Sequence, residues 1–198
     1  MRRGAAEGRR DRRLIAGILL AAGEARRFGR QKLLEPLEGV PLVRRAAQRL
    51  LNAGLRPLVV VVSAESGLRQ ALLGLDLLLA ENSSPSAGIA HSIALGIAAL
   101  PASAEAVLIA VADQPHLTTD GLKTVMAAHQ IGGITLPRYG NHRGSPAIFD
   151  RRFFSELAQL SGDRGGQRVV SAHPELVVEV PLPETMGLDI DRPEDWPA

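Results

Sequence analysis

The chain has 198 residues, of which 45% are hydrophobic and 3% aromatic, and it contains no cysteine. This length and composition favour one folded domain with an aliphatic core, and the lack of cysteine excludes disulfides and thiolate metal sites. The net charge of +2 is unevenly placed, because residues 1–13 hold six arginines and two acidic residues. We expect residues 1–13 to form a disordered basic tail and residues 14–198 to form the domain. A nucleic-acid role is not expected, because no aromatic residues alternate with the arginines.

The arginine-rich start and the apolar run LIAGILLAAG at 14–23 also resemble a signal peptide. Cleavage near Ala25 would remove the first predicted strand and the glycine after it, so we favour a mature chain that keeps this segment. No later apolar run reaches the ~18 residues of a membrane span. We therefore expect a cytoplasmic protein that binds no membrane.

Apolar segments alternate with amphipathic ones along the chain, which is typical of alternating strands and helices. In chain order the predicted elements are a strand at 14–20, a helix at 41–53, a strand at 56–63, a helix at 65–73, a strand at 75–82, a helix at 88–100, a strand at 104–113, a helix at 119–129, and strands at 132–138, 145–150 and 175–182. Thr118 or Thr119 is placed to cap the helix at 119–129. Several strands are apolar throughout, which predicts burial on both faces in a mostly parallel sheet. The fold class is therefore α/β and doubly wound.

The loop after the first predicted strand combines glycines with cations. The spacing of Gly23, Gly29 and Lys32 fits neither the dinucleotide-binding motif nor the P-loop. A solvated basic loop is the alternative, but ligands of doubly wound sheets bind beyond the carboxyl ends of the strands, which favours an anion site. Small residues let a ligand approach the backbone closely, and Arg27 and Lys32 can hold a polyphosphate.

The segment LAAGEARRFGRQK at 20–32 resembles the signature L-A-A-G-x-x-x-R-[MF]-G-x-x-K of the MobA-like nucleotidyltransferases. Further matches, in family order, are SAGIAHSIALG at 86–96, VADQP at 111–115, PRYGNHRGSPAIFD at 137–150, LSGDRGGQRV at 160–169 and LDIDRPEDW at 188–196. The resemblance is closest to the molybdenum cofactor cytidylyltransferase branch. It implies a nucleotide-diphospho-sugar transferase-like fold, which is a single Rossmann-like three-layer domain with a mostly parallel mixed sheet.

The resemblance implies roles for the residues that match its motifs. The nucleotide would be bound by Leu20, Ala21, Ala22, Gly23, Gly88 and Ser92. The catalytic cations would be Arg27 on the β- and γ-phosphates and Lys32 on the α-phosphate. The ligands of Mg²⁺ or Mn²⁺ would be Asp113 and Asp191, with Asp189 close by. The acceptor substrate would face Arg138, Arg143 and Gly144.

The implied reaction transfers CMP from CTP to the terminal phosphate of a molybdopterin-type cofactor and releases pyrophosphate. The LAAG form, rather than LAGG, goes with cytosine in this superfamily. A phosphate monoester is largely dianionic at pH 7, so the reaction needs positioning and charge neutralisation rather than a general base. A molybdenum hydroxylase or its chaperone is a candidate protein partner.

Three alternatives stay open at this point. One is a nucleotidyltransferase of the same fold that uses GTP or another phosphorylated acceptor. Another is a non-catalytic nucleotide-binding partner of a molybdenum enzyme, which the presence of Lys32, Asp113 and Asp191 disfavours. A nucleic-acid binder would depend on the arginine tail alone.

Several other residues have competing interpretations. Asp113 follows the most apolar predicted strand, where an acid is costly without a partner, and a helix cap is the alternative to a metal ligand. Glu194 and Asp195 are expected to cap the last helical turn. Trp196 is expected to pack against the domain, and Tyr139 either packs or stacks on a pterin ring. The five histidines show no metal-binding spacing.

Overall fold

The computed structural model describes residues 14–23, 28–29, 31–64 and 67–196. The basic tail at 1–13, together with Ala25 and Arg27, lies outside the described residues. None of the helices in the described part of the chain is both long enough and apolar enough to cross a membrane.

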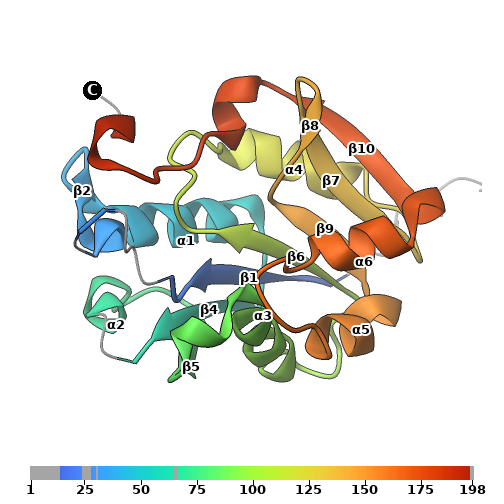
Figure 1. Cartoon of the computed structure of the whole chain (residues 1–198), viewed down its shortest axis with the longest axis horizontal. Helices are drawn as coiled ribbons and strands as arrows, with labels where there is room; N and C mark the ends of the chain where they lie inside the picture. Colours follow the sequence, from blue (N-terminus) through green and yellow to red (C-terminus); the bar gives the residue numbers. More distant parts are fainter. Residues whose placement is uncertain (1–13, 24–27, 30, 65–66, 197–198) are drawn as a thin grey trace, which may run out of the picture.

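The core of the protein is a mixed, mostly parallel sheet (Figure 1). Its strands are, in spatial order, β10 (Val177–Leu182), β7 (Ile134–Tyr139), β9 (Ala147–Asp150), β6 (Ala106–Val111), β1 (Ile15–Ala21), β4 (Leu58–Ser63) and β5 (Leu78–Asn82), with β8 (His142–Arg143) paired to β7. The pairs β1–β6, β1–β4, β4–β5 and β10–β7 are parallel, whereas β9 runs antiparallel to both neighbours. The predicted fold class is confirmed.

Helices cover both faces of the sheet, which gives three layers. Figure 1 shows α1 (Leu42–Ala53) and α4 (Thr119–Ala127) on one side, and α3 (Ile89–Ala98) and α5 (Phe154–Ala158) on the other. Side chains alternate between the faces along β1: Leu19 and Ala21 belong to the core cluster under α1, and Ile18 and Leu20 to the cluster under α3. Thr118 caps α4, because its Oγ1 accepts the Gly121 N–H at 3.0 Å.

The structure also contains short elements that the sequence patterns do not predict. They are α6 (Gln167–Ala172), α5, the hairpin of β2 (Pro36–Leu37) and β3 (Val40–Pro41), β8, and the 3₁₀ helices at Lys32–Leu34, Pro85–Ala87, Arg151–Phe153, Pro174–Leu176 and Glu184–Gly187, whereas the 3₁₀ helix at Pro193–Asp195 is the expected last helical turn. Each is too short to show a helical or alternating period. The helix expected at 65–73 is described only at α2 (Leu68–Ala71), and the strand expected from residue 75 begins at Leu78, after a turn.

The segment after β10 returns to the middle of the sheet and positions part of the candidate site. The Ile190 N–H donates to the Asp113 carbonyl oxygen at 3.0 Å, and Ile190 is buried. The Trp196 ring lies 5.9 Å from the Phe28 ring, so Trp196 packs as expected. Asp195 Oδ2 accepts the backbone N–H groups of Asp191 and Arg192, which is the expected capping role. These contacts bring residues 189–191 to the end of β6.

Tyr139, at the end of β7, is 1% exposed and therefore packs inside the domain. Its hydroxyl donates to the Ser145 carbonyl oxygen at 2.7 Å. A Cβ at Gly187 or Gly144 would stand 2.5 or 2.8 Å from the Tyr139 ring, so both backbones lie directly against it. Because the ring is buried among these residues, stacking of Tyr139 on a bound pterin is not the arrangement found.

Candidate active site

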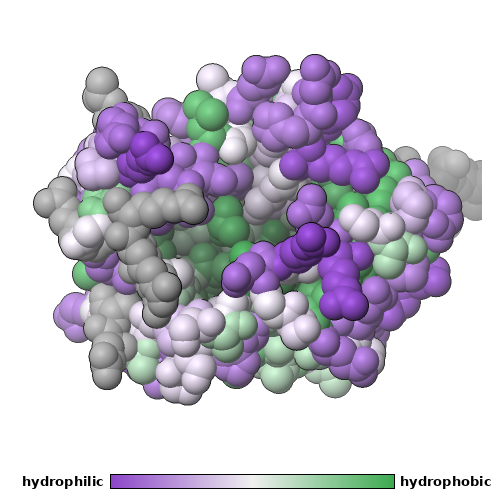
Figure 2. Space-filling model, in the orientation of Figure 1, coloured by the Kyte–Doolittle hydropathy of each residue, from purple (hydrophilic) through white to green (hydrophobic). Residues whose placement is uncertain are grey.

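A cavity of about 390 Å³ lies beyond the carboxyl ends of β1 and β6, where a doubly wound sheet binds its ligands. Figure 2 shows this face hollowed, with apolar side chains on the floor and hydrophilic ones around the rim. Among the residues lining the cavity are the predicted site residues Leu20, Ala21, Ala22, Gly23, Lys32, Gly88, Ser92, Asp113 and Asp191. The structure therefore brings together residues from separate sequence motifs.

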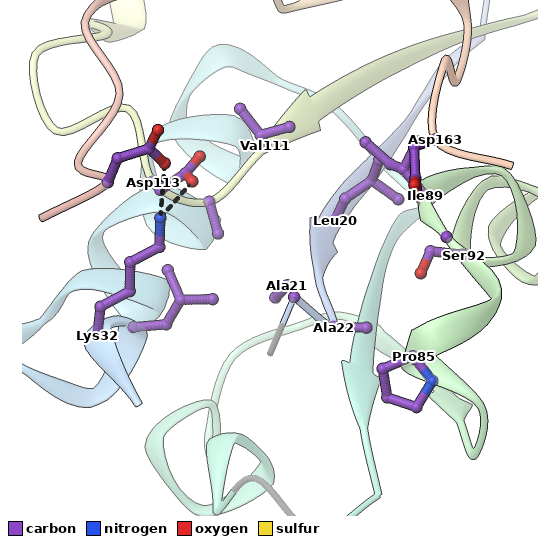
Figure 3. A pocket seen from close by; sticks show the side chains of 15 residues that line it. Leu20, Ala21, Ala22, Lys32, Pro85, Ile89, Ser92, Val111, Asp113 and Asp163 are labelled. Atoms are coloured by element: carbon purple, nitrogen blue, oxygen red, sulfur yellow. Dashed lines mark hydrogen bonds and ion pairs between the residues drawn. The ribbon is translucent and has the colours of Figure 1, made fainter. Parts of the chain in front are cut away.

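Lys32 connects two of the predicted carboxylates at one end of the cavity (Figure 3). Its Nζ donates to Asp113 Oδ2 at 2.7 Å and to the Ile190 carbonyl oxygen, and it lies 3.9 Å from Asp191 Oδ1. The Lys32 side chain is 11% exposed. Lys32 begins a 3₁₀ turn, Asp113 follows β6, and Asp191 comes from the returning C-terminal segment. The largely buried Lys32 ammonium thus neutralises the charge of Asp113, which follows a buried strand and would otherwise have no partner there.

Asp189 lies beside this group without completing a three-carboxylate cluster. Among the described residues, no three acidic or histidine side chains are arranged to hold a metal ion together. Burial, together with the negative charges of Asp113 and Asp191, raises the pKa of Asp189 to about 6, although a hydrogen bond with the Gln114 side chain opposes the shift. Asp189 is thus electrostatically coupled to the other two carboxylates.

The distances from the Lys32 ammonium to Asp113 and Asp191 indicate whether these two carboxylates could hold a divalent cation. One cationic centre contacts Asp113 at 2.7 Å and lies 3.9 Å from Asp191, so the two carboxylates can share a cation. Mg²⁺ and Mn²⁺ accept hard oxygen ligands and typically take one or two carboxylates, with phosphate oxygens and water completing the shell. Asp113 and Asp191 therefore fit a divalent cation that accompanies a polyphosphate.

The opposite end of the cavity is built around the start of α3. Ser92 Oγ accepts a hydrogen bond from Asn82 Nδ2 at 2.9 Å, and Asn82 is fully buried. Asn82 Oδ1 in turn accepts the Ser84 N–H at 2.8 Å. This network fixes the Ser92 hydroxyl in the cavity wall. Gly23 is exposed, and a Cβ on it would meet no described atom within 4 Å, so its backbone is open to a ligand.

A second cavity of about 290 Å³ adjoins the first, because both are lined by Leu20, Ile89 and Val111. Its walls are mainly aliphatic, and Arg143 and Gly144 contribute to its lining. Arg138, the third residue predicted to face the acceptor, does not line it. Arg138 and Arg143 oppose each other across β7 and β8, and both pair with Glu179, at 3.5 and 2.7 Å.

Asp163 lines the main cavity, although the sequence patterns predict no role for it. It lies in the segment GDRGG, which matches a G-D-x-G loop of the family that the sequence resembles, so the acid is part of the matched pattern although no role is predicted for it. The flanking glycines are a further local signal, since glycines permit a close approach of the loop to another element. That the loop meets α3 follows from tertiary packing: the Gly162 carbonyl oxygen accepts the Ala90 N–H at 3.2 Å.

Comparison with known proteins identifies the family. The family model of the MobA-like NTP transferase domain matches residues 17–177. Nicotine blue oxidoreductase of Paenarthrobacter nicotinovorans is 30% identical, with 94% of this chain and 97% of that protein covered. Molybdenum cofactor guanylyltransferase of Rhodobacter capsulatus is 37% identical, over 58% of each chain.

Solved structures share the fold. The crystal structure of Rv0371c from Mycobacterium tuberculosis H37Rv has a TM-score of 0.81 and 25% identity, covering 93% of this chain and 95% of its own. Its complex with manganese has a TM-score of 0.76 and 25% identity, covering 93% and 96%. The family match begins in β1 and extends to the first residue of β10, so it spans the cavity-forming strands. The chain belongs to the MobA-like NTP transferase family of nucleotidyltransferases.

Proposed function

We propose that this protein transfers CMP from CTP to the terminal phosphate of a molybdopterin-type molybdenum cofactor, with release of pyrophosphate. The observation that carries the proposal is the Lys32 ammonium between Asp113 and Asp191, at one end of a cavity that residues 20–23 help to line. Such a site offers a cation and hard oxygen ligands to a polyphosphate, and the open backbone of Gly23 to a base. GTP is the competing donor, because two relatives are named molybdenum cofactor guanylyltransferases.

The chain's own groups account for the proposed chemistry. An oxygen of the acceptor phosphate attacks the α-phosphorus in line, the bond from that phosphorus to the bridging oxygen breaks, and pyrophosphate leaves. Lys32 neutralises the charge that develops on the α-phosphate, and Arg27 the charge on the leaving phosphates. Asp113 and Asp191 would hold Mg²⁺ or Mn²⁺, which supplies further neutralisation of the triphosphate when bound. The attacking phosphate is already largely ionised near neutral pH, so no protein base is needed.

The second cavity is the proposed location of the acceptor. It shares Leu20, Ile89 and Val111 with the first cavity, so a molecule within it would lie next to a nucleotide in the main cavity. Aliphatic walls suit the face of a ring system, and Arg143 and Gly144 in the lining can make polar contacts with the acceptor. Arg143 shares Glu179 with Arg138, so an acceptor phosphate would compete with that carboxylate for the guanidinium.

A second candidate function is an oxidoreductase that acts on a heteroaromatic compound. It is favoured by the relative named nicotine blue oxidoreductase, which matches 94% of this chain, and by the aliphatic walls of the second cavity. The two functions differ in their products. A nucleotidyltransferase releases one pyrophosphate for each acceptor converted, whereas an oxidoreductase changes the oxidation state of its substrate and releases none.

The test is a pyrophosphate-release assay with CTP, GTP, ATP and UTP in turn, with Mn²⁺ or Mg²⁺, and with or without the molybdenum cofactor. The proposal predicts release that needs both the cofactor and a divalent cation, and that is fastest with CTP. Faster release with GTP would keep the reaction and change the donor. No release with any nucleotide in the presence of the intact cofactor would contradict the transferase function.

A further inference from the structure

Asp163 places a carboxylate in the wall of the nucleotide cavity, at the end away from Lys32. Figure 3 shows Asp163 near Ile89 and Ser92, across the cavity from the contact between Lys32 and Asp113. Asp163 makes no hydrogen bond or ion pair with another residue in the described part of the chain. The carboxylate oxygens of Asp163 can therefore accept hydrogen bonds from a ligand or from solvent.

Close packing of a glycine-rich loop on α3 holds Asp163 in this place. A Cβ at Gly88 would stand 2.5 Å from Asp163 Oδ1 and 2.8 Å from the backbone of Gly162. A Cβ at Gly165 would lie 3.0 Å from the Ile89 side chain. The loop and the start of α3 thus approach each other at distances that side chains would prevent. The carboxylate is set against the wall by this packing.

The charge of Asp163 decides which end of a nucleotide lies beside it. A triphosphate next to an unpaired carboxylate is repelled, whereas Lys32 attracts it at the opposite end. The nucleoside therefore lies beside Asp163, where its hydroxyl or amine groups are donors. Ser92, the neighbouring polar side chain, uses an oxygen lone pair for Asn82. Its own O–H has no described acceptor and complements the carboxylate as a donor.

We propose that Asp163 determines nucleotide specificity by accepting a hydrogen bond from the nucleoside, at a ribose hydroxyl or at an exocyclic amine of the base. This inference rests on the proposed function only in taking the main cavity as the nucleotide site. Carboxylates accept well from both kinds of donor, and a nucleotide that lacks the donor leaves the charged group unpaired in the complex. Discrimination against such nucleotides is the expected consequence.

A purely structural role makes a different prediction. A carboxylate near the start of α3 also stabilises the helix electrostatically. In that case Asp163→Asn would lower the melting temperature without changing selectivity. Asp120 offers a matched control, because it is an exposed acid in the first turn of α4 and does not line the cavity.

The experiment measures nucleotide Kd values by calorimetry, in the presence of Mn²⁺, for the wild type, Asp163→Asn and Asp120→Asn. The probes are CTP with 2′-deoxy-CTP and UTP, and GTP with 2′-deoxy-GTP and ITP, which lacks the guanine amine. The readout is the ratio of Kd values within each set. A ratio cancels the general gain in triphosphate binding that follows when a negative charge is removed. Melting temperatures of all three proteins provide the structural comparison.

The proposal predicts that Asp163→Asn reduces at least one ratio by about 10- to 100-fold, the range for a hydrogen bond to a charged group, while Asp120→Asn leaves all ratios unchanged. A reduced ribo-to-deoxy ratio identifies the ribose as the donor, and a reduced CTP-to-UTP or GTP-to-ITP ratio identifies the base. Ratios that all stay at the wild-type values overturn the proposal. If the wild type binds none of the nucleotides, the proposed function fails instead, so the two failures are distinguishable.

Discussion

Lys32 Nζ lies 2.7 Å from Asp113 Oδ2, although 81 residues separate the two in the chain. The side chains are 11% and 24% exposed, so the pair is formed largely out of water. The contact joins the 3₁₀ turn at Lys32–Leu34 to the segment after β6 at one end of the cavity. It also holds the Lys32 ammonium beside Asp113 and Asp191, the two carboxylates that fit a divalent cation.

Asp113→Asn should weaken the binding of Mn²⁺ in the presence of CTP by at least about tenfold, because it removes the charge of one of two proposed carboxylate ligands. Calorimetry measures the effect. Asp76→Asn is the control, since Asp76 is exposed and pairs only loosely with Arg56, at 3.5 Å. Equal Mn²⁺ affinity in the wild type and both variants would remove Asp113 from the metal site.

Gly88→Ala should destabilise the protein more than Gly74→Ala. Both glycines have positive φ, at 90° and 79°, so both substitutions strain the backbone. At Gly88 the new Cβ would also meet Asp163 and Gly162, whereas nothing lies within 4 Å at Gly74. We expect a loss of about 1 kcal/mol at Gly74 and about 2–3 kcal/mol at Gly88 in urea unfolding. Equal losses of unfolding free energy in the two variants would show that the loop with Gly162 and Asp163 moves away from the new Cβ without destabilising the protein.

The metal-free protein should show a carboxyl titration near pH 6 that Asp189→Asn removes. Because the folded pKa of Asp189 is raised to about 6 from an ordinary value of 3.8, the folded state binds more protons than the unfolded state between these values. The unfolding free energy should therefore fall as pH rises from about 4 to about 6, and this Asp189 contribution should stay constant at higher pH. The Asp189→Asn variant should lack that component. Carboxyl NMR and urea unfolding across this range test it, and an Asp189 carboxyl that titrates near 4 would contradict it.

Tyr139→Phe should cost about 1 kcal/mol of stability, because it deletes the hydroxyl that donates to the Ser145 carbonyl oxygen at 2.7 Å. Burial, with a smaller contribution from Asp189, raises the pKa of Tyr139, so the hydroxyl stays protonated and donates. Tyr139→Ala should cost about 3–5 kcal/mol through the cavity it leaves. Urea unfolding separates the two variants, and similar losses in both would mean that ring packing contributes little.

The sequence predicts the sheet well because its central strands are long apolar runs. The strands expected at 14–20 and 104–113 correspond to β1 and β6, and the residues just beyond them line the main cavity. The short helices α5 and α6 have too few turns to show a period. Strand order and the antiparallel direction of β9 depend on pairing between distant segments, which local patterns do not encode.

The candidate site was predictable to the extent that motifs mark it. Asp189 and Asp191 are two residues apart, so spacing offers no reason why only Asp191 approaches Lys32 within 4 Å. The hydrogen bond of Ile190 to the Asp113 backbone makes that distinction, because it fixes how the returning segment lies. Tertiary contacts likewise determine where Asp163 lies. They also bring Arg138 and Arg143 to the same carboxylate, Glu179.

The proposed function requires Lys32 to bind the phosphates of a nucleoside triphosphate. Its most direct test is a calorimetric titration of the wild type, Lys32→Ala and Lys123→Ala with CTP and GTP, each with and without Mn²⁺. Lys123 is an exposed lysine on α4 and serves as the control for loss of a cation. We predict Mn²⁺-dependent binding to the wild type and to Lys123→Ala, and about 10- to 100-fold weaker binding to Lys32→Ala. Unchanged affinity in Lys32→Ala would contradict this requirement.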